Sequence, residues 1–313
     1  MSLTSLIKTN SDIKEFLLRT MPRRDAFISS FDQPAFSTKN ACAVPLGEKS
    51  RQAQIGMLTD FLFRFVTAKA VHIPVGYDTT LLGIAQLQRI SRFHEAGGAY
   101  EQAVHYLSLA AVAQANFEKY KVILDAEEAL NKETAPAILF MTRMEQLAHG
   151  AMIDQNFFLD ISEEEMTESL RMLQLYYATF LKSGVIHSDS DVILSPNFGM
   201  WGEKVGGATG DLYVDGVLYD LKSRIGTGYH QQDVMQLWGY YLLHCLNQEC
   251  LNSKESNNGS LENRRIDHLV IYYARYGITN SCPVIKPDKA ILTEFASLIE
   301  KRAQQGEKKN AKK

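Results

Sequence analysis

The chain has 313 residues, of which 45% are hydrophobic, and its 33 lysine and arginine residues face 36 aspartate and glutamate residues for a net charge of −3. This length allows one large domain or two smaller ones, and the composition is ordinary for a soluble globular protein. The charge argues against holding nucleic acid by bulk electrostatics, although a locally basic groove is compatible with it.

The cysteines and the hydropathy pattern further limit what kind of protein this is. No Cys-x-x-Cys spacing occurs among the four cysteines, so we expect free thiols and neither a zinc site nor an iron–sulfur cluster. No signal-peptide pattern is visible, and no run approaches the ~20 apolar residues that span a bilayer. We therefore expect a cytoplasmic protein without a membrane segment.

The first half of the chain reads mainly as helices. Asp12 and Glu15 resemble a capping box that opens a short helix ending near Met21. Residues 1–50 are otherwise interpreted as an N-terminal arm. Apolar residues at helical spacing predict a core helix over 51–70 and further helices at 81–95, 100–131, 137–149 and from Ser162 to Gly184. We interpret 71–184 as an α-helical insertion, whose histidines fit core and surface positions better than ligand positions.

The second half, 185–305, is predicted to be an α/β core. We expect a strand at 192–194, a glycine-rich loop, a hairpin over 211–222, a helix at 233–246, a strand at 266–276 and a terminal helix at 289–303. Residues 306–313 form a lysine-rich tail, which we expect to be frayed, with contact to nucleic acid as the less favoured alternative.

The hairpin is the most informative feature. Asp215-Gly216 is a strong signal for a type I′ turn, in which both central residues need a positive φ. A turn at these residues pairs Val214 with Val217 and sets Asp211 opposite Asp220, with their Cβ atoms about 5 Å apart. Two opposed carboxylates repel one another, and we expect the pair to be tolerable only with a divalent cation between them.

Alternation along the strand places Asp220 and Lys222 on one face and apolar residues on the other, so we expect the apolar face to be the buried one. The alternative is a solvated face with ordinary charges. The second aspartate favours a metal site. Asp211, Asp220 and the main-chain carbonyl of Leu221 are hard oxygen ligands for Mg²⁺ (or Mn²⁺), and Lys222 would orient or activate an attacking water during phosphodiester hydrolysis.

These residues resemble a known family. Asp211…Asp220-Leu221-Lys222 is similar to the Asp-(x)n-(Asp/Glu)-x-Lys signature of the PD-(D/E)xK nuclease superfamily, and Gln236-x-x-x-Tyr240 resembles a motif of its RecB-like branch. On a helix these last two residues lie one turn apart. Taken singly, Gln236 would read as a surface amide and Tyr240 as a core aromatic.

The resemblance implies a restriction-endonuclease-like core, a mixed sheet flanked by helices, with Asp211, Asp220, Lys222 and Gln236 as the catalytic set. The helix predicted over 51–70 would be the first helix of this nuclease core. An acidic residue there often supports the metal in this superfamily, which makes Asp60 a candidate, with Glu168 behind it. The candidate nucleic-acid contacts are Tyr240, Arg224 and Lys204. The cysteine cluster of the iron–sulfur members is absent, and no histidine matches the upstream histidine of the RecB-like branch.

We therefore expect a metal-dependent nuclease, a hydrolase that cuts DNA, with RNA left open as a substrate. The family context suggests antiphage (antiviral) defence, processing of mobile elements or repair. Two alternatives stay open: a non-catalytic nucleic-acid-binding or scaffold protein on the same fold, and an effector subunit that requires a partner protein from the same operon. The sequence leaves the oligomeric state undecided.

Overall fold

The computed structural model describes residues 3–30, 35–37, 44–47, 51–127, 130–150, 163–250, 261 and 263–310, and it omits the side chains of 250 and 305–310. The chain divides into two compact units. We call Met1–Cys42 with Asp189–Lys313 the sheet unit and Ala43–Ser188 the helical unit. Among the described residues, no helix combines the length and apolar character needed to cross a membrane.

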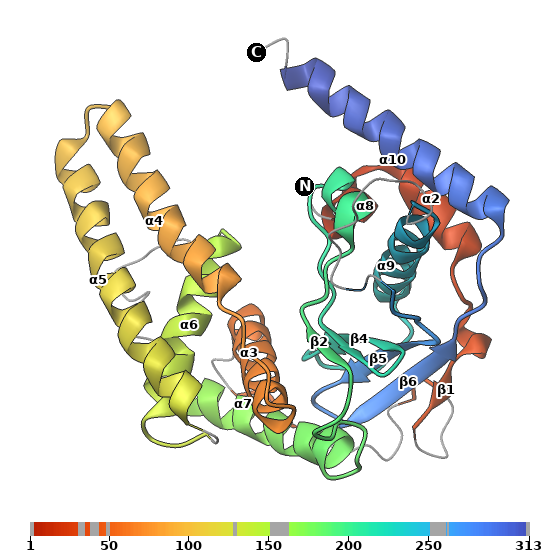
Figure 1. The fold of residues 1–313 in the computed structure, drawn as a ribbon, viewed down its shortest axis with the longest axis horizontal. Coiled ribbons are helices and arrows are strands. Elements are labelled where there is room, and N and C mark those ends of the chain that lie inside the picture. The colour runs from red at the N-terminus through yellow and green to blue at the C-terminus, as the bar shows by residue number, and fades with distance from the viewer. Residues whose placement is uncertain are drawn as a thin grey trace. The chain divides into compact units, whose positions relative to one another are not determined.

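The sheet unit is built on a six-stranded mixed sheet of order β1-β6-β5-β4-β3-β2 (Figure 1). Its strands are β1 (Ile28–Ser29), β2 (Val192–Leu194), β3 (Leu212–Val214), β4 (Val217–Lys222), β5 (His268–Tyr273) and β6 (Ile278–Pro283). The β4–β5 pair is parallel and the other pairs are antiparallel. A parallel pair needs a crossover connection, and helix α9 (Gln231–Cys250) supplies it. The α/β class predicted from the sequence is thereby confirmed.

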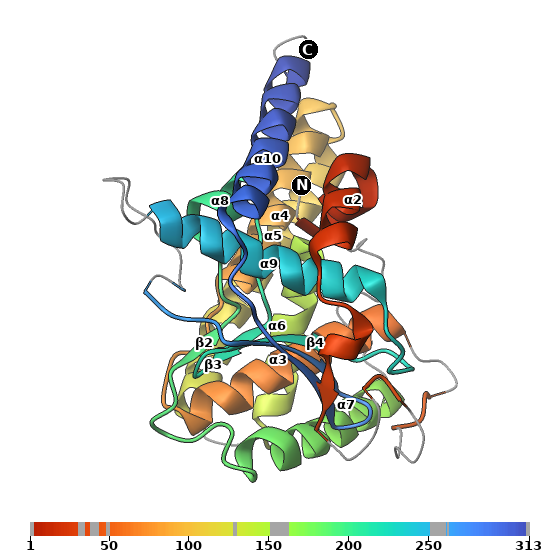
Figure 2. The ribbon, with the colours of Figure 1, turned by 90° about the vertical axis from the view of Figure 1, so that its right-hand side faces the viewer.

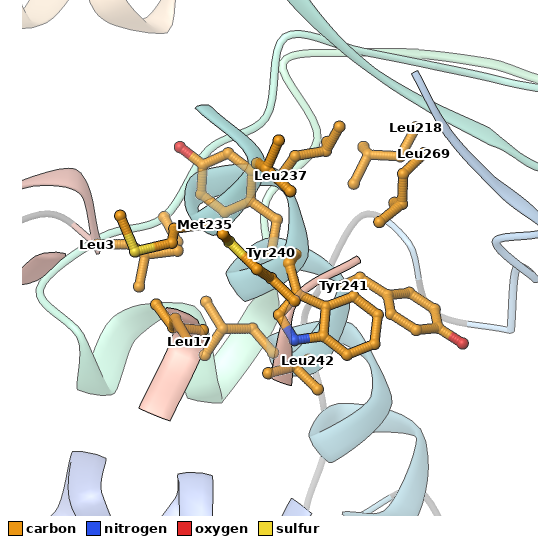
Figure 3. Close-up of a cluster of buried hydrophobic side chains, with 14 of the residues drawn as sticks. Leu3, Leu17, Leu218, Met235, Leu237, Tyr240, Tyr241, Leu242 and Leu269 are labelled. Atoms are coloured by element: carbon orange, nitrogen blue, oxygen red, sulfur yellow. The ribbon is translucent and has the colours of Figure 1, made fainter. Parts of the chain in front are cut away.

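Helix α9 lies over one face of the sheet (Figure 2). Other helices of the sheet unit contact it: α1 (Leu3–Thr9), α2 (Ser11–Thr20), α8 (Gly199–Lys204) and α10 (Lys289–Asn310). A 3₁₀ turn, Arg24–Ala26, precedes β1. In Figure 3, Leu218 and Leu269 of neighbouring strands lie on one side of the α9 side chains, and Leu3 and Leu17 of the N-terminal helices lie on the other. This apolar cluster is the core that fixes α9 on the sheet.

The N-terminal region differs from the arm that the sequence suggested. Leu3, Phe16 and Leu17 are almost fully buried, helices α1 and α2 contact α9, and β1 pairs with β6. The seven residues of α1 are too few to show a clear period, so its burial against α9 decides its structure. Strand β6 and helix α8 were likewise not predicted.

The helical unit consists of α3 (Gln52–Ala70), α4 (Asp78–Ala96), α5 (Tyr100–Ala126), α6 (Thr134–Ala148) and α7 (Glu163–Tyr176), followed by a π-helical turn, Tyr177–Leu181. We expected 51–70 to belong to the nuclease core, but α3 groups with this unit and contacts α6 and α7. The reason is visible in its phenylalanines: Phe61, Phe63 and Phe65 are buried, and Phe63 stacks on Tyr176 of α7.

Several predicted helix ends also differ from those in the structure. Helix α5 ends at Ala126, short of residue 131, whereas α10 continues past residue 303 to Asn310. Ser162, the predicted cap of α7, and residues 311–313 of the lysine-rich tail lie outside the described residues.

Candidate functional site

The β3–β4 hairpin forms in the predicted register. Asp215 and Gly216 both have positive φ, 45° and 89°, as a type I′ turn requires. Val214 pairs with Val217, and the ladder continues to Leu212 and Tyr219. Gly216 is also needed for space, because a Cβ there would lie 2.9 Å from Oδ2 of Asp267. The turn therefore fixes the positions of Asp211, just before β3, and of Asp220, within β4.

The face that carries Asp220 is buried, contrary to our expectation that only the apolar face would be. Asp220 and Lys222 alternate with Tyr219 and Leu221, so they share the face of Leu218, which points toward α9 in Figure 3. Asp220 is paired with the fully buried Ile271 of β5 and is only 2% exposed. A strand next to a crossover helix is covered on that face, which the hairpin pattern alone does not indicate.

Asp220 and Lys222 form a buried ion pair. Nζ of Lys222 donates a hydrogen bond to Oδ1 of Asp220 at 2.9 Å and lies 2.8 Å from Oδ2, yet Oδ2 is buried without a hydrogen bond of its own. Burial raises the pKa of Asp220, and the ammonium of Lys222 offsets this only in part. Burial also disfavours the charged form of Lys222, but the carboxylates of Asp220, Asp211 and Asp233 outweigh it and raise the lysine pKa. Lys222 is therefore a permanent cation at neutral pH.

Asp211 lies where the β3–β4 ladder ends. Its Oδ2 accepts a hydrogen bond of 2.6 Å from the main-chain N–H of Leu221. Its charge contributes to the raised pKa of Lys222, which places Asp211 close to the ammonium. The two aspartates are thus compensated by Lys222 and by a main-chain amide. Our argument that the pair is tolerable only with a divalent cation does not hold, because the chain itself supplies these partners.

Gln236 and Tyr240 meet on α9 beside the carboxylates. Nε2 of Gln236 donates to Oη of Tyr240 at 2.9 Å, one helical turn away as predicted. Tyr240 stacks on Phe198, with ring centroids 4.8 Å apart. Burial raises the pKa of Tyr240 to about 12, and the charges of Asp211 and Asp220 add to the rise. The structure therefore brings the predicted helix motif to the predicted hairpin motif.

Asp233 is a third carboxylate at this place, and our reading of the sequence missed it. It lies in the first turn of α9, where acidic residues are common for helix stability alone, so its residue type gave no distinctive signal. Its charge adds to the raised pKa of both Asp220 and Lys222. Both carboxylate oxygens of Asp233 accept hydrogen bonds from the guanidinium of Arg224. Arg224, a predicted nucleic-acid contact, is thus tied to the site by an acidic partner.

The other predicted residues have partners of their own. Nζ of Lys204 lies 4.0 Å from the centre of the Trp201 ring and 3.4 Å from Glu300. Asp60 belongs to the helical unit, where its carboxylate is 3.1 Å from Nε of Arg64. In the same unit, Glu168 accepts a hydrogen bond from the main-chain N–H of Gly47 at 3.3 Å. Asp60 and Glu168 therefore have partners within the helical unit.

The side chains that could coordinate a metal ion are few, but their oxygen atoms are of the kind that Mg²⁺ prefers. Among the described side chains, no group of three or more His, Cys, Asp or Glu residues is arranged to hold a metal. Mg²⁺ commonly uses one or two carboxylates and fills its remaining positions with water. Asp211 and Asp220 meet that need, and the buried Oδ2 of Asp220 is an oxygen whose hydrogen-bonding capacity the protein does not satisfy.

Comparison with known proteins gave no relative. The chain matches no family model, no curated protein and no solved structure.

Proposed function

We propose that the chain is a Mg²⁺-dependent nuclease that hydrolyses phosphodiester bonds in DNA, with the restriction-endonuclease-like core that the PD-(D/E)xK motifs imply. The observation that carries the proposal is the convergence of Asp211, Asp220 and Lys222 from the hairpin with Gln236 and Tyr240 from α9. Perturbed ionisable groups concentrated at one place are typical of catalytic sites. The mixed sheet flanked by helices is compatible with such a core.

In this proposal Asp211, Asp220 and the carbonyl of Leu221 would hold the ion. A bound Mg²⁺ supplies positive charge to the phosphate and lowers the pKa of a bound water. Lys222 remains protonated at neutral pH because its pKa is raised. It is therefore suited to donate a hydrogen bond to the negative charge that develops on the phosphate and not to abstract a proton. Gln236, held by its hydrogen bond to Tyr240, would orient water or substrate.

Cleavage assays test the proposal with a control taken from the same hairpin. The chain is incubated with labelled single-stranded DNA, duplex DNA and RNA in Mg²⁺ or Mn²⁺. We expect Asp220→Asn and Lys222→Met to lower the cleavage rate by about 10²-fold or more, the usual effect of removing one charge-stabilising group. Asp215→Asn makes the same chemical change in the turn and should leave the rate unchanged. Cleavage that survives both site substitutions would reject the assignment.

A second candidate is a nucleic-acid-binding protein without catalysis. The internal pairing of the site favours the absence of catalysis, since Asp220 is neutralised by Lys222 and Asp233 by Arg224 without a metal ion. Metal identity separates the two candidates. A nuclease should bind DNA with Ca²⁺ and cut it only with Mg²⁺ or Mn²⁺, whereas a pure binder should show the same affinity with each ion and cut with none.

A further inference from the structure

Exposed apolar side chains are concentrated on two helices of the helical unit. Thirteen large hydrophobic residues are exposed in the described part of the chain, and eight of them belong to α4 and α5: Leu81, Leu82, Phe93, Tyr100, Val104, Leu107, Val112 and Val122. Single exposed apolar residues are ordinary, but a contiguous set commonly marks an interaction surface. The two helices are adjacent in sequence and pack against one another (Figure 1).

Helix α5 has two apolar faces. One face is buried and includes Ala110, Ala113 and Phe117. The other is exposed and follows a spacing of three and four residues from Tyr100 to Ala115, which places its members in one line along the helix. Glu118 lies on the same line, between Ala115 and the last apolar member, Val122. We call this line the outer stripe: Tyr100, Val104, Leu107, Ala111, Ala115 and Val122. At 1.5 Å per residue it is about 33 Å long, and the spacing of three and four residues, which holds from Tyr100 to Ala115, is the pattern by which one helix packs on another.

The charges beside the outer stripe identify an occupant. Glu101 and Lys119 are eighteen positions apart, which is five full turns, so both lie on the same flank of α5. Neither has an ion-pair partner among the described residues; Lys119 only approaches the ring of Tyr120, at 5.4 Å. Both lie nine positions from Ala110. A second α5 that runs antiparallel about an axis at Ala110 would bring each Glu101 to the Lys119 of the other copy.

We propose that α5 is the interface of a two-fold symmetric homodimer in which the two outer stripes pack antiparallel. The interface is self-complementary, as such symmetry requires. Small residues lie near the axis, Ser108, Ala111 and Ala115, and they let the helix backbones approach closely. Tyr100 of one copy would lie near Val122 of the other. The proposal is independent of the nuclease proposal, since no residue of the sheet unit takes part.

Sedimentation velocity of the full chain over a range of concentrations tests the interface, with two side chains of matched exposure. Val104 is 64% exposed and lies on the stripe, whereas Leu82 is 63% exposed and lies on α4, outside the stripe. We expect wild type to be a dimer at micromolar concentration. Val104→Glu should raise the dimer dissociation constant by at least tenfold, and Leu82→Glu should leave it within about twofold. A monomeric wild type, or equal effects of the two substitutions, would overturn the proposal.

Charge exchange tests the antiparallel arrangement. Glu101→Lys and Lys119→Glu should each weaken the dimer by placing like charges together, and the double variant should restore it. In a parallel pair each residue would face its own counterpart, so the double variant would restore nothing, and that result would contradict the arrangement. Binding of the wild type to phosphatidylcholine vesicles in place of self-association would also contradict the proposal, because it would assign the stripe to a lipid surface.

Discussion

The buried pair of Asp220 and Lys222 allows a sharp prediction about stability. Lys222→Met removes the ammonium and leaves the carboxylate of Asp220, 2% exposed, without its ionic partner. Breaking a buried pair from one side costs about 3–5 kcal/mol. The side chain of Lys222 retains 19% exposure, so water softens the loss and we expect the lower end of this range, about 3 kcal/mol in the free energy of unfolding.

The second substitution should relieve most of this cost. Asp220→Asn in the Lys222→Met background removes the buried charge itself, so the double variant should be more stable than Lys222→Met alone by at least about 1.5 kcal/mol, a coupling within the usual range for contacting residues. Both substitutions nearly conserve side-chain volume, so cavity formation does not contribute to the difference in stability between the two variants. If the double variant is as unstable as Lys222→Met, the unpaired charge of Asp220 is not the cause.

Tryptophan fluorescence during urea denaturation is a suitable assay. The two tryptophans of the chain, Trp201 and Trp238, both belong to the sheet unit and are buried, so the signal reports that unit separately from the helical one. The pH dependence has a defined sign. Because burial raises the folded-state pKa of Asp220, the deficit of Lys222→Met should be largest above that pKa and should disappear as the pH falls toward about 3.9, the usual aspartate value. A deficit that grows on acidification would refute the reasoning.

Three further predictions concern stability. Burial lowers the pKa of His244 to about 4. The stability that neutral His244 provides is therefore complete above about pH 6.5, and about 3 kcal/mol of it should be lost as the pH falls toward 4. In urea titrations at these two pH values, His244→Gln should remove this part of the pH dependence. Gly216→Ala should destabilise the sheet unit by more than about 1 kcal/mol, because its φ is 89° and its Cβ would lie 2.9 Å from Asp267; an unchanged urea midpoint would contradict this. Asn10→Ala should cost about 1 kcal/mol, because the Asn10 side chain caps α2 by accepting a hydrogen bond from Ile13 at 3.0 Å, and Asn10→Ser should retain most of the stability.

The hairpin was predictable because its information is local. Asp215-Gly216 determines the turn, and the turn determines the register, so the pairing of Val214 with Val217 followed from two residues. The one-turn contact of Gln236 with Tyr240 followed in the same way from helical geometry. Both depend on neighbours in sequence.

The features that sequence reasoning missed depend on residues far apart in the chain or on the path of an irregular loop. The burial of Asp220 results from α9, which packs over its face of the sheet. The pairing of Arg224 with Asp233 requires the loop before α9 to turn back, which no spacing rule predicts. The grouping of α3 with the helical unit follows from side-chain packing of Phe63 on Tyr176, a contact between residues more than a hundred positions apart.

The central claim is that Asp211 and Asp220 bind a divalent cation, and Mn²⁺ binding followed by electron paramagnetic resonance tests it most directly. Mn²⁺ is titrated into wild type, Asp220→Asn and the control Asp215→Asn, and the free ion is measured. The account predicts one site in wild type and in Asp215→Asn, with at least tenfold weaker binding in Asp220→Asn. Equal binding by all three proteins, or no binding by any of them, would contradict it.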